Sequence, residues 1–263
     1  MTSRVLYALA FTGLLTLASL FLITALISLG AARFPALGGS LLFASLVEVV
    51  VYLALAAWLS RDFTSPKAAL GFVRVPFELL LLGVGLGLAL HGPADFVETQ
   101  LERWLPLPDA VLFERARRLS PSAALDRASL LFAAAAVIPL VEELFFRGAL
   151  LGWLENASTR RAAAWLSGIS FTLSHAEPRS WPALGLVATA LGLLRWASPG
   201  LLPCILLHAT FNATTLAVLF VQPRETLGRS EPSWPLFTLG SLLSVVILQR
   251  AWRTRAARLG SAL

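Results

Sequence analysis

The stretch ASLLFAAAAVIPLVEELFFRGALLG, residues 128–152, is apolar except for three charged side chains near its centre. Its length is that of a membrane-crossing helix, which needs roughly 20 consecutive apolar residues. Glu142, Glu143 and Arg147 are costly inside a bilayer, and charged residues at such positions commonly have a function. The stretch therefore predicts a membrane-spanning helix with a candidate functional site inside it.

The rest of the chain has the same apolar character. Of its 263 residues, 57% are hydrophobic and 14% are charged, and its mean hydropathy is +0.76, whereas soluble domains carry about 25% charged residues. Apolar segments lie at residues 5–32, 36–60, 75–91, 128–152, 161–175, 182–195, 201–221 and 234–252. The first is too long for the apolar part of a signal peptide, about 7–15 residues. We therefore predict an all-α, polytopic membrane bundle of about eight transmembrane helices.

The charge distribution predicts the orientation of this bundle. Arg4 and the basic residues after the second, fourth, sixth and eighth segments fall on one side if successive segments cross in alternate directions. The long loop on the opposite side, residues 92–127, holds five arginines and six acidic residues. Because positively charged loops stay in the cytoplasm, both termini are predicted to be cytoplasmic. The same basic residues explain the net charge of +6 without a nucleic-acid partner.

Four regions follow from the segments. Residues 1–91 form N-terminal transmembrane helices, 92–127 an extramembrane or interfacial connector, 128–221 the core with the charged stretch, and 222–263 a final transmembrane helix with a basic tail. The connector has apolar and charged residues at helical spacing, interrupted by two prolines, so either interfacial helices or a solvated loop fits it. Cys204 is the only cysteine, which excludes an intrachain disulfide and a cysteine-based metal site.

Helical spacing separates the three charged residues of the opening stretch. Glu143 and Arg147 are four residues apart, so they share a face and can reduce each other's desolvation cost by pairing. Glu142 points about 100° away from Glu143 and has no basic residue one turn further on. It needs a partner from another helix. The alternative interpretation is that all three residues make a structural contact between helices.

Three further polar side chains lie inside apolar segments. His175 ends the sequence FTLSH (171–175), and His208 and Asn212 begin and end HATFN (208–212). With a rise of about 1.5 Å per residue, all three lie roughly 10–20 Å from the cytoplasmic end of their helices, at the depth of Glu142. Each alone is explained as a satisfied core group. Together they must face one another or a wet cavity, because lipid cannot satisfy them.

Such a cavity favours hydrolysis by an activated water molecule. A carboxylate can take a proton from water, imidazoles can orient water or bind a metal, and an amide can donate to an oxyanion. Ser174 precedes His175 directly and points elsewhere on a helix, so no serine–histidine relay is indicated. The His-Glu-x-x-His pattern of zinc proteases is absent from the sequence.

The sequences EELFFR (142–147), FTLSH and HATFN resemble the EExxxR, FxxxH and HxxxN motifs of the CPBP intramembrane proteases. That superfamily includes the type II CAAX prenyl endopeptidases and the bacterial Abi proteins. The resemblance implies that 128–221 is a catalytic core in which Glu142 is the general base, helped by His175. It implies that His208 and Asn212 stabilise the oxyanion. Glu143, Arg147 and Phe171 would support this group or hold the substrate.

The resemblance also suggests cofactors, substrates and location. A metal-free glutamate mechanism is favoured; if zinc takes part, Glu142, His175 and His208 would bind it. The substrate would be a peptide or C-terminal tail of a membrane-associated protein, in the cytoplasmic (inner) membrane of a bacterium. Processing of C-terminal sorting signals would resemble the myxosortase branch.

Other functions remain open for the same residues. A non-catalytic membrane scaffold or chaperone, or a bacteriocin-immunity protein, could keep the fold and use the motifs for packing. A proton-coupled transporter could use the buried carboxylates, but repeat symmetry would be expected and none is visible in the sequence. Glu48 is expected to make a polar contact between helices, with cavity lining as the alternative. Gly83, Gly85 and Gly87 are expected to allow close helix packing.

Overall fold

The computed structural model describes residues 3–260 apart from 62, 66, 68–69 and 222–230, and these described residues form helices and no strand. The elements are α1 (Ser3–Arg33), η1 (Pro35–Leu37), α2 (Leu41–Ser60), α4 (Phe77–Ala89), α5 (His91–Trp104), α6 (Asp109–Leu119), α7 (Ala124–Phe132), η2 (Ala133–Val137), α8 (Ile138–Glu143), η3 (Leu144–Leu150), α9 (Leu151–Ala157), α10 (Arg160–Ser174), η4 (Pro178–Ser180), α11 (Trp181–Ala197), α12 (Leu202–Val221) and α13 (Trp234–Gly260). The prediction of an all-α fold is confirmed for this part of the chain.

Six helical stretches in the described residues are long and apolar enough to cross a membrane. They are Ser3–Arg33, Leu41–Ser60, Phe77–Trp104, Ala124–Ala157, Leu202–Val221 and Trp234–Ala257. The chain is thus a multi-pass membrane protein. The remaining two predicted segments correspond to α10 and α11, which have 15 and 17 residues. At about 1.5 Å per residue these two are shorter than a bilayer core of about 30 Å, so eight crossings stay a prediction.

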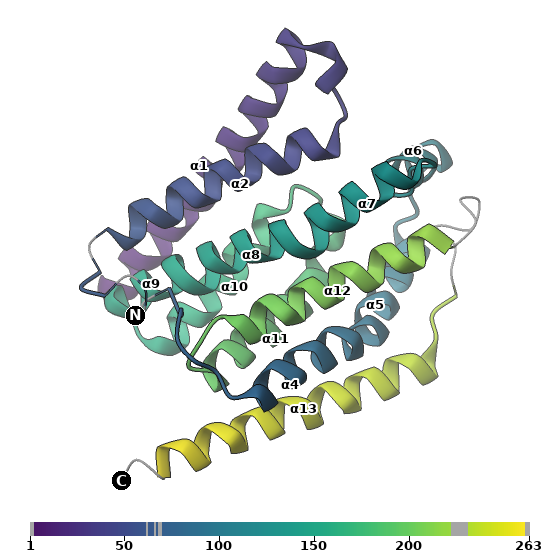
Figure 1. The fold of residues 1–263 in the computed structure, drawn as a ribbon. Coiled ribbons are helices and arrows are strands. Elements are labelled where there is room, and N and C mark those ends of the chain that lie inside the picture. The colour runs from purple at the N-terminus through teal and green to yellow at the C-terminus, as the bar shows by residue number, and fades with distance from the viewer. Residues whose placement is uncertain (1–2, 62, 66, 68–69, 222–230, 261–263) are drawn as a thin grey trace.

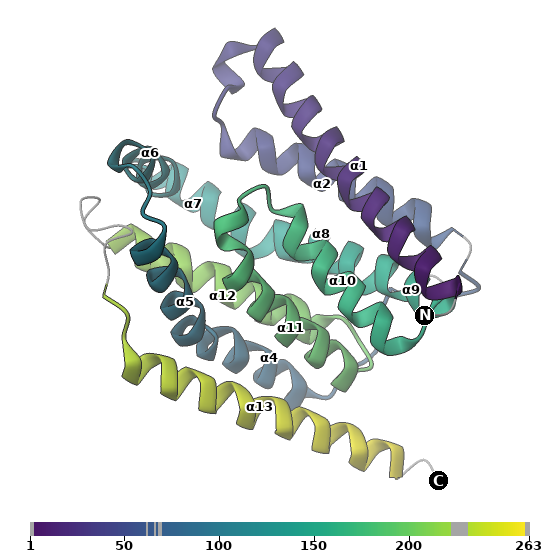
Figure 2. The same ribbon diagram turned by 180° about the vertical axis from the view of Figure 1, so that it is seen from behind.

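The helices run side by side, with the α1–α2 hairpin at one edge and α13 at the other (Figure 1). Both views place the two termini at the same end of the bundle (Figure 2). The loop between α2 and α4 and the loop between α11 and α12 contact each other at this end. The Leu201 amide donates a hydrogen bond to the Gly71 carbonyl oxygen at 3.0 Å. This arrangement fits an even number of crossings. The cytoplasmic orientation of that end stays a prediction.

A helical stretch crosses the predicted boundary between membrane segment and connector at residues 91–92. Only Leu90 separates α4 from α5, and the helical stretch continues to Trp104. The ring of Phe96 on α5 packs on Trp234 and Phe237 of α13, with ring centroids 4.5 and 4.6 Å away. The first part of the predicted connector is therefore a packed helix of the bundle. The predicted boundary at 222 lies outside the described residues.

Glycines set the distance between α4 and α12. A Cβ atom on Gly83 would lie 2.4 Å from the Pro203 carbonyl oxygen, and one on Gly87 would lie 2.5 Å from that of Leu207. Both glycines therefore allow close packing, as predicted. Gly85 faces α13 instead, where a Cβ would meet Ile247 at 3.5 Å. Because α12 carries His208 and Asn212, this contact helps to position the candidate site.

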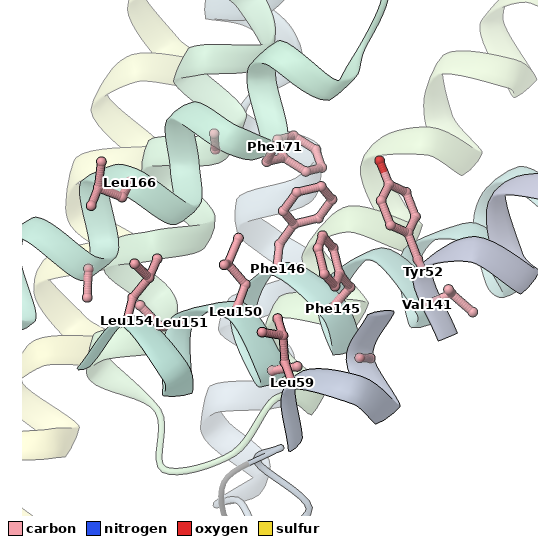
Figure 3. Close-up of a cluster of buried hydrophobic side chains, with 14 of the residues drawn as sticks. Tyr52, Leu59, Val141, Phe145, Phe146, Leu150, Leu151, Leu154, Leu166 and Phe171 are labelled. Atoms are coloured by element: carbon pink, nitrogen blue, oxygen red, sulfur yellow. The ribbon is translucent and has the colours of Figure 1, made fainter. Parts of the chain in front are cut away.

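A cluster of aromatic rings lies beside the charged stretch. Phe146 packs against Tyr52 of α2 and Phe171 of α10, with ring centroids 5.3 Å apart in both pairs. Phe145 stacks on Tyr52 at 4.9 Å. Figure 3 shows these rings together with the leucines that continue the core toward α9. The cluster joins α2, α10 and the central helix into one core that holds the charged residues.

Candidate active site

The helix that carries the charged residues departs from α geometry on both sides of them. Ala133–Val137 and Leu144–Leu150 are π-helical, and α8 lies between them. Pro139 is near the start of α8 and has no N–H to donate to the preceding turn. The wider π-helical turn before Pro139 accommodates the absence of this hydrogen bond. Turns of this kind often occur at functional sites, and here they bracket Glu142 and Glu143.

Glu143 is the centre of a buried ion pair. Its Oε1 atom accepts hydrogen bonds from Arg147 Nη1 at 3.2 Å and from His208 Nδ1 at 3.0 Å. Arg147 also lies above the Phe171 ring, with Cζ 4.3 Å from the centroid, and donates to the Ala188 carbonyl at 3.5 Å. Glu143 and Arg147 are 0% and 1% exposed. The pairing predicted from their spacing is present in the structure.

His208 links this ion pair to Glu142. Its Nδ1 atom donates to Glu143, so Nε2 is the nitrogen that faces the other carboxyl group. Nε2 lies 3.5 Å from Glu142 Oε2. One imidazole of α12 therefore contacts both adjacent glutamates of the central helix. This bridge gives Glu142 a partner from another helix, as its isolated position on the helical wheel requires.

Glu142 has a second partner that spacing alone could not identify. Its carboxyl group forms a hydrogen bond with the carboxyl group of Glu48 on α2. Both groups line the same cavity. The expected polar contact between helices is thus present, and the alternative, cavity lining, applies as well. The one signal in the sequence was a lone glutamate in an apolar helix.

His175 lies at the C-terminal end of α10, where the chain leaves the helix. Its Nδ1 atom donates to the Phe171 carbonyl at 2.9 Å, which leaves Nε2 for other contacts. Trp181 Nε1 donates to the His175 carbonyl at 2.8 Å and holds this turn. The Phe171 ring packs edge-on against both histidines, with centroids 4.9 Å from His175 and 5.6 Å from His208. Phe171 therefore packs against both imidazoles.

Asn212 connects α12 to the first π-helical segment. Its Nδ2 atom donates to the Ala134 carbonyl at 2.8 Å. A primary amide has a second N–H, and the residue is part of the cavity wall. Asn212 thus has a structural hydrogen bond in addition to the oxyanion role that the motif implies.

These side chains surround a cavity of about 310 Å³. Polar side chains in its wall include Glu48, Glu142, His175, His208 and Asn212, together with Thr24, Tyr52 and Ser174. Its apolar wall includes Leu20, Ile23 and Ile27 of α1 together with Leu184, Val187 and Phe211. The structure thus brings Glu142, both histidines, Asn212 and Phe171 to one cavity. Glu143 and Arg147 are buried behind its wall, which favours a supporting role for them over substrate contact.

The donor geometry does not fit the zinc set that the resemblance suggested. Among the residues that the structure describes, no three side chains of the types His, Cys, Asp and Glu come together closely enough to hold a metal ion. Glu142, His175 and His208 share the cavity but do not form a three-ligand set. We therefore derive no reaction step through a metal.

The fold and the cavity define a class: a multi-pass helical membrane protein with a carboxylate–histidine site enclosed by its helices. Residues 124–214 match the family model described as type II CAAX prenyl endopeptidase Rce1-like. This match confirms the CPBP resemblance for that segment, about a third of the chain, which contains all three motifs. Glu48 lies outside it. No curated protein and no solved structure matches the chain.

Proposed function

We propose that the protein is an intramembrane endopeptidase in which Glu142 activates water for hydrolysis of a peptide bond. The observation that carries this proposal is the contact of Glu142 with His208, 3.5 Å away, at the wall of a cavity inside the bundle. A buried carboxylate beside an imidazole is suited to remove a proton from water. The match to a CAAX endopeptidase family supports the same reaction class.

Each polar residue of the cavity has a separate role in the proposed reaction. The Glu142 carboxylate takes one proton from a water molecule oriented with the help of His175, and the hydroxide oxygen bonds to the peptide carbonyl carbon. His208 and the second amide N–H of Asn212 stabilise the oxyanion that forms. The ion pair of Glu143 and Arg147 keeps His208 in place through the Nδ1 hydrogen bond. No metal is needed for these steps.

The cavity also favours a class of substrate. Its wall combines apolar side chains, among them Leu20, Ile23 and Ile27 of α1, with carboxyl and imidazole groups, which suits an extended peptide with apolar side chains or a lipid group. We therefore propose a membrane-associated protein or peptide as the substrate, cleaved during maturation or C-terminal processing in the cytoplasmic (inner) membrane of a bacterium. A prenylated C-terminal tail is the probe that the family's name suggests.

Substitution of Glu142 tests the proposal. The probes are quenched fluorescent peptides in proteoliposomes, one with a farnesylated cysteine near its C-terminus and one with a transmembrane segment. Glu142→Gln preserves size but removes the base, so we expect kcat to fall by about 10²–10⁴-fold. Glu155→Gln is the matched control, because Glu155 lies on the same long helix and pairs with Arg160 at the surface.

One outcome would contradict the catalytic role of Glu142, and another would contradict the metal-free mechanism. Normal cleavage by a folded Glu142→Gln protein would exclude Glu142 as the base, and the scaffold interpretation would then be preferred. Loss of activity after exhaustive chelation, restored by added zinc, would contradict the metal-free mechanism while leaving the peptidase activity in place.

A further inference from the structure

We propose that Glu48 is a second catalytic carboxyl group, which shares one proton with Glu142 and donates it to the leaving amine. This inference rests on the proposed peptidase function and extends it to a residue outside the family match. It follows from the hydrogen bond between the two carboxyl groups and from their common cavity.

The α2 helix presents a polar face to the cavity at this point. Glu48 and Tyr52 are four residues apart, and both line the cavity. Tyr52 is 2% exposed, and its ring packs on Phe145 and Phe146, with ring centroids 4.9 and 5.3 Å away. This packing fixes the rotation of α2. Glu48 is therefore directed toward Glu142 and away from lipid.

The hydrogen bond between Glu48 and Glu142 requires a proton. Two ionised carboxylates have only acceptor atoms, so one of the two groups must be protonated for the bond to form. The reaction proposed above requires an ionised Glu142, so we assign one proton and one negative charge to the pair. Glu142, which lies 3.5 Å from His208, carries the charge, and Glu48 carries the proton.

The groups that face this pair come from every element around it. The central helix contributes Glu143 and Arg147, which neutralise each other. His175 and His208 face the pair from α10 and α12, and Tyr52 from α2 itself. The α1 residues of the cavity wall carry no charge. Because the ion pair of Glu143 and Arg147 is neutral as a whole, it does not decide which of Glu48 and Glu142 holds the shared proton.

Two carboxyl groups complete the proton balance of peptide hydrolysis. Glu142 takes one proton from water as the oxygen bonds to the carbonyl carbon. When the carbon–nitrogen bond breaks, Glu48 gives its proton to the departing amine. Glu142 is then protonated and Glu48 is ionised, and transfer of the proton along their hydrogen bond restores the starting state. No oxidant, metal or further reactant enters.

The test compares Glu48→Gln, Glu48→Asp and the control Glu155→Gln in proteoliposomes with the farnesylated peptide. In the native protein, kcat should fall at low pH, where Glu142 becomes protonated, and at high pH, where Glu48 loses its proton. Glu48→Gln keeps a hydrogen-bond donor to Glu142 but cannot release a proton. We expect its kcat to fall by about 10²-fold or more, with the fall at high pH abolished and the fall at low pH retained. The control should match the native protein.

A second measurement needs no substrate. The infrared band of a protonated carboxylic acid should be present in the native protein near neutral pH, weaker in Glu48→Gln, and unchanged in Glu155→Gln. A structural role for a protonated Glu48 would also weaken this band, but it would leave the pH profile of kcat unchanged. Either unchanged result in a folded Glu48→Gln protein overturns the inference.

The design separates this inference from the proposed function. If Glu142→Gln is inactive and Glu48→Gln has native kcat and pH profile, only the role of Glu48 is wrong. If Glu142→Gln is active, the peptidase proposal itself fails. Should Glu48→Gln not fold, Glu48→Asp decides the question: withdrawal of the acid by one methylene should lower kcat on the order of 10²-fold, and an unchanged kcat contradicts the proposal.

Discussion

At the scale of single residues, the site depends on how each buried charge is compensated. Glu143 Oε1 accepts from both Arg147 and His208, while its Oε2 atom is buried without a hydrogen-bond partner among the described residues. A buried ion pair adds little over apolar packing, but loss of one member leaves a charge that is costly to bury. Arg147 is therefore the side chain whose loss should most disturb the protein without touching the cavity.

Substitution of Arg147 tests this role. Arg147→Met leaves Glu143 buried with His208 as its one remaining polar partner, and we expect a loss of about 3–5 kcal/mol in the free energy of unfolding. The double variant Glu143→Gln/Arg147→Met removes both charges and should recover much of that loss. The measurement is denaturant unfolding in detergent micelles.

The control for this prediction is Arg117→Met. Arg117 pairs with Glu114 on α6 with its side chain 59% exposed, and exposed ion pairs are screened by solvent. It should unfold like the native protein. Equal destabilisation by the two single variants would contradict the special role of the buried pair.

At the scale of elements, the position of His208 and Asn212 depends on close contact between α4 and α12. The helices approach along Gly83 and Gly87, whose hydrogen atoms face backbone carbonyls. In a membrane there is little hydrophobic gain from helix association, so small residues that allow close packing contribute much of the contact. The glycines could be predicted to pack closely, but their partner helix could not, because small residues do not specify what they face.

A pair of glycine substitutions tests this contact. In Gly83→Ala, the new methyl group would lie 2.4 Å from the Pro203 carbonyl oxygen, so the helices must separate. Gly192→Ala on α11 adds the same methyl group where no atom lies within 4 Å. We expect Gly83→Ala to lose about 1–3 kcal/mol of unfolding free energy and Gly192→Ala to lose none. The readout is thermal unfolding, and equal melting temperatures would refute the contact's importance.

At the scale of the whole molecule, the two ends of the bundle differ in charge. At the end with the termini, Arg61 and Arg74 lie between α2 and α4, and Arg160 and Arg161 begin α10. At the other end, arginines are paired: Arg117 and Arg118 hydrogen-bond to Glu114 and lower the pKa of that carboxyl group to about 2. The basic residues near the termini are thus not balanced by acidic residues in sequence as those of residues 92–127 are, which fits the predicted cytoplasmic location of both termini.

Cysteine labelling tests the orientation. In a Cys204→Ala background, single cysteines replace Arg74, Arg253 and Arg117, all exposed side chains. A membrane-impermeant maleimide should label Arg117→Cys in intact cells and the other two only after permeabilisation. Labelling of Arg74→Cys and Arg117→Cys from the same side would contradict the predicted topology.

The sequence by itself determined the features that depend on local spacing. Apolar length identified the membrane helices, and the four-residue spacing of Glu143 and Arg147 identified their ion pair. The three motifs indicated which polar residues form one site. No contact between them followed from the sequence, and only their similar depth in the membrane suggested that they lie close together. These properties belong to one helix at a time, and a helix has a known rise and rotation per residue.

Only the tertiary structure decided which helices face one another. His208 contacts Glu143 across 65 positions of sequence, and Asn212 contacts Ala134 across 78. The hydrogen bond from Glu48 to Glu142 depends on the rotation of α2, which is fixed by packing of Tyr52 against the aromatic cluster. The continuation of α4 into α5 likewise follows from packing on α13. Helix rotation and pairing arise from side-chain fit across the whole bundle, and no local pattern in a single helix contains that information.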